Sequence, residues 1–426
     1  MALLRGSAFR IWASGGVEFF WTLLPEFFDA GRCGLLEVLA VRNPMPELQL
    51  DGSELDGSES PLDPAADPKT EPSPGSATGE GMLLAWGLGL ALSGLLVAVR
   101  PEVLIPFGAS VVASMVLGSL LIPWLRRWKA GQVIRQEGPQ AHLKKAGTPT
   151  MGGISFLPVG LLVAAGWTGW HPQVLAVAVL TLAYGFVGWL DDWQVIRQQS
   201  NKGLSPSQKL FLQLGIAALF CTYLVWQGVP TELTVPRLGR IPLGGLFWPL
   251  AVFVLVGTNN AVNLTDGMDG LAAGVVAIVL AGLGLIQGDP ALSLLAFGLS
   301  GACLGFLAHN HYKARMFMGD TGSLGLGGAL AGLALLGDQL WALALMGGVL
   351  VVEALSVILQ VSYFKYTKRK TGAGKRLLRM SPLHHHLELG GWSEVQVVGS
   401  LYGITALLVG LGWAWWYWAG MSATLA

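Results

Sequence analysis

Long apolar segments separated by short polar ones dominate the chain from residue 82 onward. Most of them approach 20 residues, the length with which a helix crosses the roughly 30 Å hydrocarbon core of a bilayer. The runs cover residues 82–99, 104–125, 151–168, 173–190, 208–227, 245–262, 271–287, 291–308, 322–336, 341–364 and 394–418. The first and the ninth are the shortest or weakest. The pattern therefore predicts an all-α, polytopic integral membrane protein with ten or eleven transmembrane helices.

Residues 1–81 do not follow this pattern. From Asp51 to Gly81 the chain consists mainly of Gly, Ser, Pro, Asp and Glu, which offer little to bury against the cost of ordering the backbone. Residues 8–40 are more apolar and suit an interfacial helix, unless translation starts downstream, for example at Met82. We expect an acidic, largely disordered N-terminal extension at 1–81 and a transmembrane domain at 82–426 that holds the catalytic residues.

Composition agrees with a membrane location and excludes a soluble enzyme. Hydrophobic residues make up 53% of the chain and charged residues 12%, about half the share of roughly 25% that is usual in soluble domains. The formal net charge is zero, but residues 1–80 carry 5 basic and 13 acidic side chains, whereas the remainder carries 21 and 13. The membrane part is therefore basic, and the positions of its basic residues predict its orientation.

Cytoplasmic loops of membrane proteins are enriched in Lys and Arg. The loops after the even-numbered runs hold 18 such residues, whereas the alternate loops hold only Arg100, Arg237 and Arg240. The first set is therefore predicted to be cytoplasmic and the C-terminus to lie outside. With eleven runs, the acidic extension is cytoplasmic too.

Residues capable of chemistry gather on the same predicted face. Five aspartates and six of the seven histidines lie there, namely Asp191, Asp192, Asp266, Asp269, Asp320, His142, His309, His311, His384, His385 and His386. This arrangement favours an active site in a cytoplasmic cleft. A transporter would instead require charged or interrupted positions near the bilayer midplane. Glu353, inside the tenth run, is the exception, and its charge should face the bundle interior or a partner.

Two acidic segments are candidates for catalysis and metal binding. Adjacent Asp191 and Asp192 repel each other, so either one takes up a proton or a cation holds both ionised; a solvated helix end would look the same. Asn263, Asp266 and Asp269 are spaced three apart, which places oxygen ligands suited to Mg²⁺ on one helix face if the helix continues. The competing interpretation is an Asp-Gly turn that closes the helix.

Two further segments suit phosphate groups. Residues 317–323 precede a Gly-rich run, and small residues at a helix start expose backbone N–H groups to phosphate, where Asp320 could bring a metal. Consecutive His384, His385 and His386 cannot all bind one metal from a regular helix, because their side chains diverge by about 100° each. With Lys375 and nearby arginines, they better suit a phosphorylated substrate.

Six motifs, in this order, resemble the family of phospho-N-acetylmuramoyl-pentapeptide-transferases, within the polyprenyl-phosphate N-acetylhexosamine-1-phosphate transferases. They are GPxxHxKKxGTPTMGG at 138–153, LDD at 190–192, NKGL at 201–204, NAVNLTDGMDGLA at 260–272, ARMFMGDTGSL at 314–324 and RMSPLHHHLE at 379–388. The resemblance covers about residues 100–418. It implies a ten-span helical fold with a cytoplasmic cleft in the bacterial inner membrane, usually as a homodimer, and no nucleic-acid partner.

The resemblance also implies a reaction. UDP-MurNAc-pentapeptide and undecaprenyl phosphate would give undecaprenyl-pyrophosphoryl-MurNAc-pentapeptide (lipid I) and UMP, with Mg²⁺ as cofactor, in peptidoglycan synthesis and hence in cell-wall biogenesis, cell shape and division. Direct attack by the lipid phosphate and a route through an aspartyl-phosphate both remain open. A UDP-GlcNAc-1-phosphate transferase of the same superfamily is the alternative, against which the PLHHHLE sequence argues.

Site roles follow residue by residue from the matching motifs. Asp320 would bind Mg²⁺ with Asn263 close to it, and Asp191 would remove the proton from the lipid phosphate. The implied catalytic group also contains Asp192, Asp266 and His384. The implied substrate-binding group contains Asp269, Phe317 near the uracil, Lys145, Lys202, Lys209, His385 and His386. In one departure from the family, Val195 replaces a usual Lys, whose charge Arg197 would have to supply.

Overall fold

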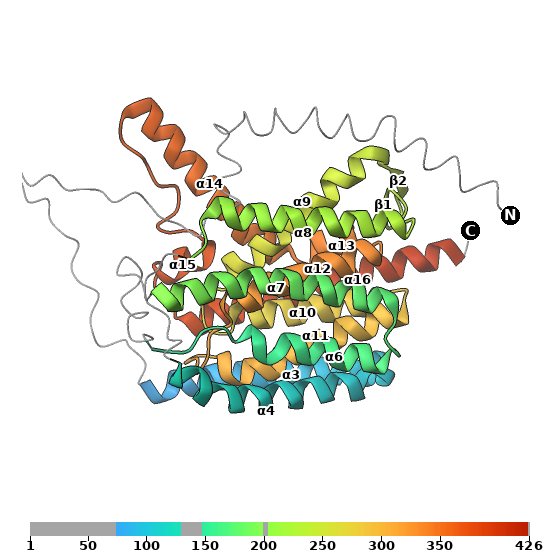
Figure 1. Cartoon of the computed structure of the whole chain (residues 1–426), viewed down its shortest axis with the longest axis horizontal. Helices are drawn as coiled ribbons and strands as arrows, with labels where there is room; N and C mark the ends of the chain where they lie inside the picture. Colours follow the sequence, from blue (N-terminus) through green and yellow to red (C-terminus); the bar gives the residue numbers. More distant parts are fainter. Residues whose placement is uncertain (1–73, 129–146, 199–202, 425–426) are drawn as a thin grey trace, which may run out of the picture.

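The computed structural model describes residues 74–128, 147–198 and 203–424 as a bundle in which most helices lie side by side along one axis (Figure 1). The helices are α3 (Pro74–Val99), α4 (Leu104–Arg127), α6 (Gly153–Trp167), α7 (Pro172–Gln198), α8 (Pro206–Trp226), α9 (Phe247–Thr265), α10 (Leu271–Ile286), α11 (Pro290–Asn310), α12 (Gly319–Leu336), α13 (Leu340–Met346), α14 (Gly348–Thr371), α15 (Leu383–Glu388) and α16 (Glu394–Thr424). Short 3₁₀ turns precede α4 and α9, at Pro101–Val103 and Gly244–Leu246.

The all-α membrane fold predicted from the apolar runs is confirmed. Within the described ranges, eight helices are long and apolar enough to cross a membrane, and α6 and α10 are shorter apolar helices. Each predicted run overlaps at least one helix. The total of ten or eleven spans stays a prediction.

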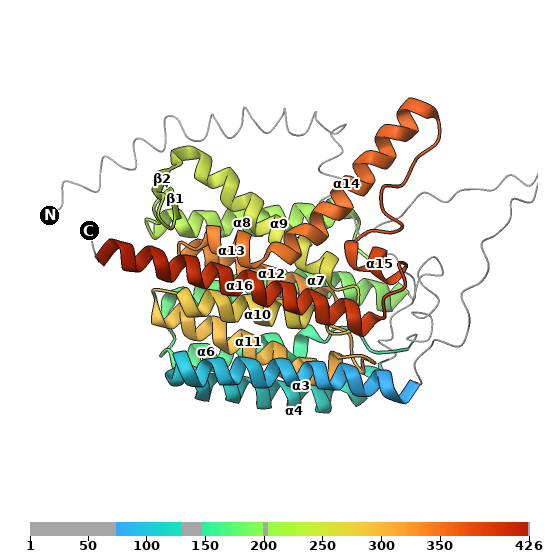
Figure 2. The same cartoon turned by 180° about the vertical axis from the view of Figure 1, so that it is seen from behind.

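Two local features differ from the pattern of runs. The run at 341–364 forms two helices, because the chain breaks at the Gly347–Gly348 pair and α14 leaves the bundle at an angle (Figures 1 and 2). Pairs of small residues such as these are common kink sites. Between α8 and α9 lies an antiparallel hairpin of β1 (Glu232–Val235) and β2 (Gly239–Pro242). Apolar run length carries no information about either feature.

Helix α3 begins at Pro74, so it extends into the segment 51–81 for which the sequence predicts disorder. Adding residues to an existing helix is much easier than nucleating one, and proline is well tolerated in a first helical turn. The helix formed by the apolar stretch after Gly81 therefore extends toward the N-terminus into the polar residues that precede it. The remainder of the predicted extension, residues 1–73, lies outside the described residues.

The centre of the bundle consists of α10, α11 and α12. All sixteen residues of α10 are buried, as are nearly all of α12. A helix that is apolar on every side belongs in the interior. The peripheral helices instead direct large apolar side chains outward, including Leu90 on α3, Leu219 on α8 and Leu359 on α14, which fits contact with lipid.

Glycines let α12 approach its neighbours closely. A β-carbon on Gly327 would lie 2.5 Å from the Cα of Asn259 on α9. A β-carbon on Gly188 of α7 would collide with the main-chain oxygen of Asp320. Small residues at such contacts allow backbones to pack directly against each other in membranes.

The two ends of the bundle differ. At one end, which we call the site end, α7 and α9 finish, α12 begins, and α15 lies beside them (left in Figure 1). At the other end lie the hairpin and the end of α16 (right in Figure 1), where the Arg237 guanidinium stands 4.5 Å from the ring centre of Trp418. The candidate site residues belong to the site end.

We predict opposite effects from two glycine-to-alanine substitutions. Gly327→Ala should destabilise the protein by about 1–3 kcal/mol, because its methyl group meets main-chain atoms of α9 that cannot turn aside. Gly257→Ala on α9 is the control, because a β-carbon there meets nothing within 4 Å, and alanine favours a helix by about 1 kcal/mol. Thermal unfolding in detergent measures both; equal melting temperatures would contradict the close approach.

Candidate active site

Asp192 connects α7 to the beginning of α12. Its carboxylate accepts the N–H of Asp320 at 3.2 Å and that of Thr321 at 3.0 Å, as well as the Thr321 hydroxyl at 2.8 Å. The first N–H groups of a helix lack partners within the helix and carry partial positive charge, so a buried carboxylate is well placed there. Asp192 thereby fixes the start of the helix that carries Asp320.

Asp320 is a completely buried carboxylate at the middle of the site. The Lys209 ammonium, on α8, donates a hydrogen bond to its Oδ2. The Asn263 side chain, on α9, donates to its Oδ1 at 3.0 Å and to the Ser323 hydroxyl at 2.8 Å. Helices α8, α9 and α12 therefore converge on this carboxylate, and the positively charged Lys209 side chain contacts it.

Asp191 precedes Asp192 on α7, about two turns before that helix ends at Gln198. It is 4% exposed, and its Oδ1 accepts the N–H of Leu204 at 3.0 Å. The Gly203 backbone passes so close that a β-carbon there would lie 2.6 Å from the carboxylate. The two neighbouring aspartates thus take different surroundings, which separates their roles: Asp192 supports α12, and Asp191 faces the segment before α8.

Asn263, Asp266 and Asp269 would share one helix face only if the helix continued through Asp269, but helix α9 ends at Thr265. The expectation of one shared helix face is therefore wrong, and the competing Asp-Gly turn is the structure found. Gly270 adopts φ +82°, a left-handed conformation that favours glycine. Asn263 remains on α9 and reaches Asp320, whereas Asp266 is half-buried at the end of the helix.

Asp269 is held by two other parts of the chain. Its Oδ2 accepts the N–H of Ala314 at 2.8 Å, and its own N–H donates to Glu394 Oε1 at 2.7 Å. The next residue is fixed as well, since the Gly270 N–H donates to Asn310 Oδ1 at 3.1 Å. The motif search missed Glu394 and Asn310; their only signal is a polar side chain at a helix end.

The three histidines point to three different partners, as expected for consecutive residues. His384 is completely buried, with Nδ1 3.2 Å from Glu353 Oε2, and its ring fills the space beside Gly267. His385 Nδ1 lies 3.3 Å from Glu388, and His386 Nδ1 accepts the N–H of Arg379 at 3.1 Å. Glu353 is 1% exposed, so the prediction that it faces the bundle interior is confirmed.

The other predicted binding residues are placed as follows. Phe317 is half-buried, and its main chain pairs with Pro149 and Gly152 in the GTPTMGG segment. Arg197, the substitute for the charge absent at Val195, is exposed at the end of α7. Lys145 and Lys202 lie outside the described residues.

Asp320 and Asn263 are the residues here that could hold a metal. Among the described residues, no group of three or more His, Cys, Asp or Glu side chains could do so alone. The Asp320 carboxylate and the Asn263 amide each carry oxygen, the ligand atom that Mg²⁺ prefers, and Mg²⁺ commonly uses one or two protein carboxylates and completes its shell with water and substrate phosphates. Here the Asn263 nitrogen faces Asp320, so this amide would have to turn for its oxygen to bind a metal. The ammonium against Asp320 further indicates that this position favours positive charge. The donor set therefore fits a substrate-shared Mg²⁺ site.

Comparisons with known proteins point in one direction. The model of glycosyl transferase family 4 matches residues 174–338, and the phospho-N-acetylmuramoyl-pentapeptide-transferase signature 1 matches residues 145–157. A phospho-N-acetylmuramoyl-pentapeptide-transferase of Synechococcus sp. (strain JA-2-3B'a(2-13)) is 79% identical over 340 residues, which are 80% of this chain and 100% of the relative. Proteins of the same name from Synechococcus elongatus and Synechocystis sp. are 56% and 51% identical over 73% and 77% of this chain, and over 87% and 92% of their own lengths.

Lys209→Met should be one of the more destabilising single changes in this chain. It leaves the Asp320 carboxylate buried without its ammonium partner, a loss typically worth about 3–5 kcal/mol. Adding Asp320→Asn should recover part of that loss, because both charges are then gone. Unfolding in detergent with a chelator present measures the cycle; a double variant that loses the sum of the two single losses would contradict the pairing.

Proposed function

The chain belongs to the family of phospho-N-acetylmuramoyl-pentapeptide-transferases, bacterial membrane proteins of peptidoglycan synthesis, and from that premise we propose its reaction. It transfers phospho-MurNAc-pentapeptide from UDP-MurNAc-pentapeptide to undecaprenyl phosphate, giving lipid I and UMP. The observation that carries this proposal is the buried pair of Asp320 and Lys209, which Asp192 fixes at one end of a lipid-facing bundle. A site at the membrane boundary would serve both an aqueous nucleotide and a lipid phosphate.

Phosphoryl transfer depends mainly on positioning and on neutralising charge. In the direct one of the two routes, an oxygen of the lipid phosphate attacks the β-phosphorus of the nucleotide sugar. The bond between that phosphorus and the bridging oxygen breaks, and the oxygen leaves on UMP. Asp191 accepts the proton of the lipid phosphate, a role that its separation from Asp192 supports, because Asp192 is already engaged by α12.

The residues around Asp320 neutralise the diphosphate. Asp320 and Asn263 would hold Mg²⁺, which would supply positive charge to the phosphate oxygens when bound. Lys209 contributes a second positive charge at the same place. Lys145 and Lys202 belong to the proposal as further phosphate-attracting residues.

The remaining motif residues bind or position the nucleotide sugar. Asp266 and Asp269 line the turn between α9 and α10, and Phe317 lies near the uracil. His385 and His386 face the sugar-nucleotide side. His384 has no exposed surface, so we assign it a positioning role. Its ring packs against Gly267, and its Nδ1 lies 3.2 Å from Glu353 Oε2.

We place the site end at the cytoplasmic side of the bacterial inner membrane. The basic loops support this orientation, since the final turn of α14 alone contains Lys368, Arg369 and Lys370. The homodimer implied by the family resemblance is part of the same proposal.

The reaction predicts Mg²⁺-dependent release of UMP by the detergent-purified protein, only when undecaprenyl phosphate is present. Asp191→Asn, Asp266→Asn and Asp320→Asn should each lower the rate by about 100-fold or more, since each removes a charge from the reacting groups. Glu102→Gln, an exposed position at the far end, is the control. Full lipid I synthesis by all three variants would refute the assignment, and faster turnover of UDP-GlcNAc would establish the alternative donor.

The orientation predicts which introduced cysteines an impermeant maleimide can reach. Arg240→Cys, on the hairpin, should react in intact spheroplasts, whereas Lys370→Cys should react only after permeabilisation. Both positions are exposed, while the native Cys221 and Cys303 are buried, and Cys33→Ser removes the third thiol. The reverse labelling pattern would place the site end outside.

A further inference from the structure

We propose that helix α3 is a positioning element for Asp269, acting through the loop of residues 311–314. The inference rests on the proposed function in one respect, because it takes Asp269 as a substrate-binding residue. Its structural part, that α3 sets the position of this loop, stands on contacts at the site end alone.

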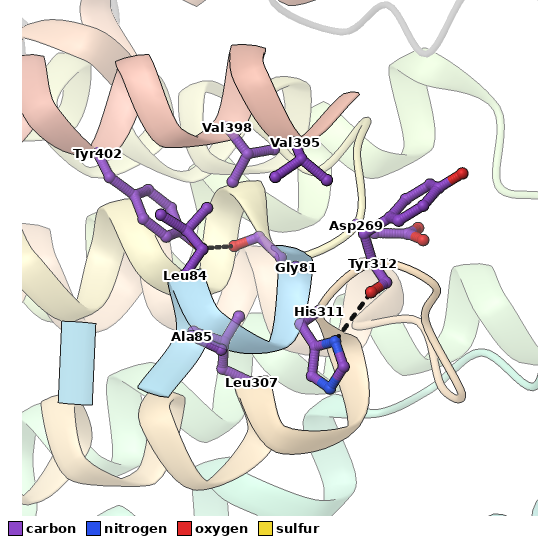
Figure 3. A pocket seen from close by; sticks show the side chains of 11 residues that line it. Gly81, Leu84, Ala85, Asp269, Leu307, His311, Tyr312, Val395, Val398 and Tyr402 are labelled. Atoms are coloured by element: carbon purple, nitrogen blue, oxygen red, sulfur yellow. Dashed lines mark hydrogen bonds between the residues drawn. The ribbon is translucent and has the colours of Figure 1, made fainter. Parts of the chain in front are cut away.

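The loop is the part of the chain that orients the Asp269 side chain. It follows α11, and its Ala314 N–H is the donor to Asp269 Oδ2 at 2.8 Å. The loop is itself tied to α11, because the His311 N–H donates to the Leu307 oxygen at 2.9 Å and the Arg315 N–H donates to the His309 oxygen at 2.7 Å. Within the loop, His311 Nδ1 lies 3.0 Å from the Tyr312 oxygen (Figure 3). A displacement of Tyr312 would therefore be passed within two residues to the N–H that fixes the carboxylate.

Helix α3 lies directly against Tyr312. Gly81 is buried, and a β-carbon on it would lie 2.5 Å from the Tyr312 oxygen and 2.9 Å from the Tyr312 β-carbon. In Figure 3, Gly81 faces Tyr312 while Leu84 and Ala85 lie toward Tyr402 and Leu307 around a small cavity. Only a residue without a side chain allows the helix to come this close.

The opposite side of the Asp269 turn is fixed independently. The Tyr402 hydroxyl, on α16, donates to the Gly270 oxygen at 2.7 Å, and Glu394 accepts the Asp269 N–H. The turn is therefore held between α16 on one side and the loop backed by α3 on the other. Because α16 holds the turn from its side, a displacement of the loop changes the Ala314–Asp269 contact instead of moving the whole turn.

Helix α3 has few contacts with the interior of the bundle. Only 11% of its most apolar 18-residue segment is buried, against 83% for the corresponding segment of α11. Gly81, the first buried residue among those of α3 whose burial is described, nevertheless packs against Tyr312 in the loop that orients Asp269.

Gly81→Leu in the full-length, detergent-purified protein tests the proposal. The Michaelis constant for UDP-MurNAc-pentapeptide should rise about tenfold, the factor that corresponds to losing one hydrogen bond to a charged group, while kcat changes little. Gly87→Leu is the matched control on the same helix, because Gly87 is exposed and a β-carbon there meets nothing within 4 Å. Gly81→Ala should give a smaller change in the same direction.

A second measurement does not depend on activity. Hydrogen exchange of peptides that contain the Ala314 amide should become faster in Gly81→Leu and stay unchanged in Gly87→Leu. A normal Michaelis constant together with unchanged exchange in folded Gly81→Leu would overturn the proposal. Faster exchange in a protein whose wild type releases no UMP would retain the contact from α3 and refute the proposed function instead.

Discussion

The bond between Asp192 and the first N–H groups of α12 is the contact on which the candidate site depends. It joins α7 to α12 across 128 positions of sequence. The Asp192 carboxylate accepts N–H groups at the start of α12 that would otherwise need water as a partner. Glycines on both helices let them come close enough for this contact. Once the start of α12 is fixed, Asp320 lies where Lys209 and Asn263 can reach it, and a buried ionised group is tolerable only with such partners.

The parts of the fold set by the bilayer could be predicted from the sequence. Run length identifies the helices, because a span must exceed the hydrocarbon thickness. The position of Glu353 follows too, since a charge in hydrocarbon must turn inward, and the structure pairs it with His384. The break at Gly347 and the hairpin were not predicted, because both arise from local backbone preferences that a hydropathy pattern averages away.

Within the site, residue types could be predicted but not their division of labour. Spacing placed Asn263, Asp266 and Asp269 together on a continued helix, whereas a turn sends Asn263 to Asp320 and Asp269 to Ala314. The sequence does not distinguish Asp191 from Asp192; they differ only in their hydrogen-bond partners elsewhere in the chain. Glu394 and Asn310 could not be found at all, because a single polar residue at a helix end has no pattern. Tertiary hydrogen bonds to main-chain groups decide these roles, and a sequence does not display them.

The glycine-lined packing of α12 has a consequence for engineering. Proteins are often made more heat-resistant by filling gaps in their interior. Here the interior offers no gap at Gly188 or Gly327, where a single methyl group would strike backbone. Filling these two positions therefore gives no gain in heat resistance, and the outer helices, whose apolar side chains face lipid, are the better targets. Because those helices contact the surrounding detergent or lipid, its choice should influence durability during purification.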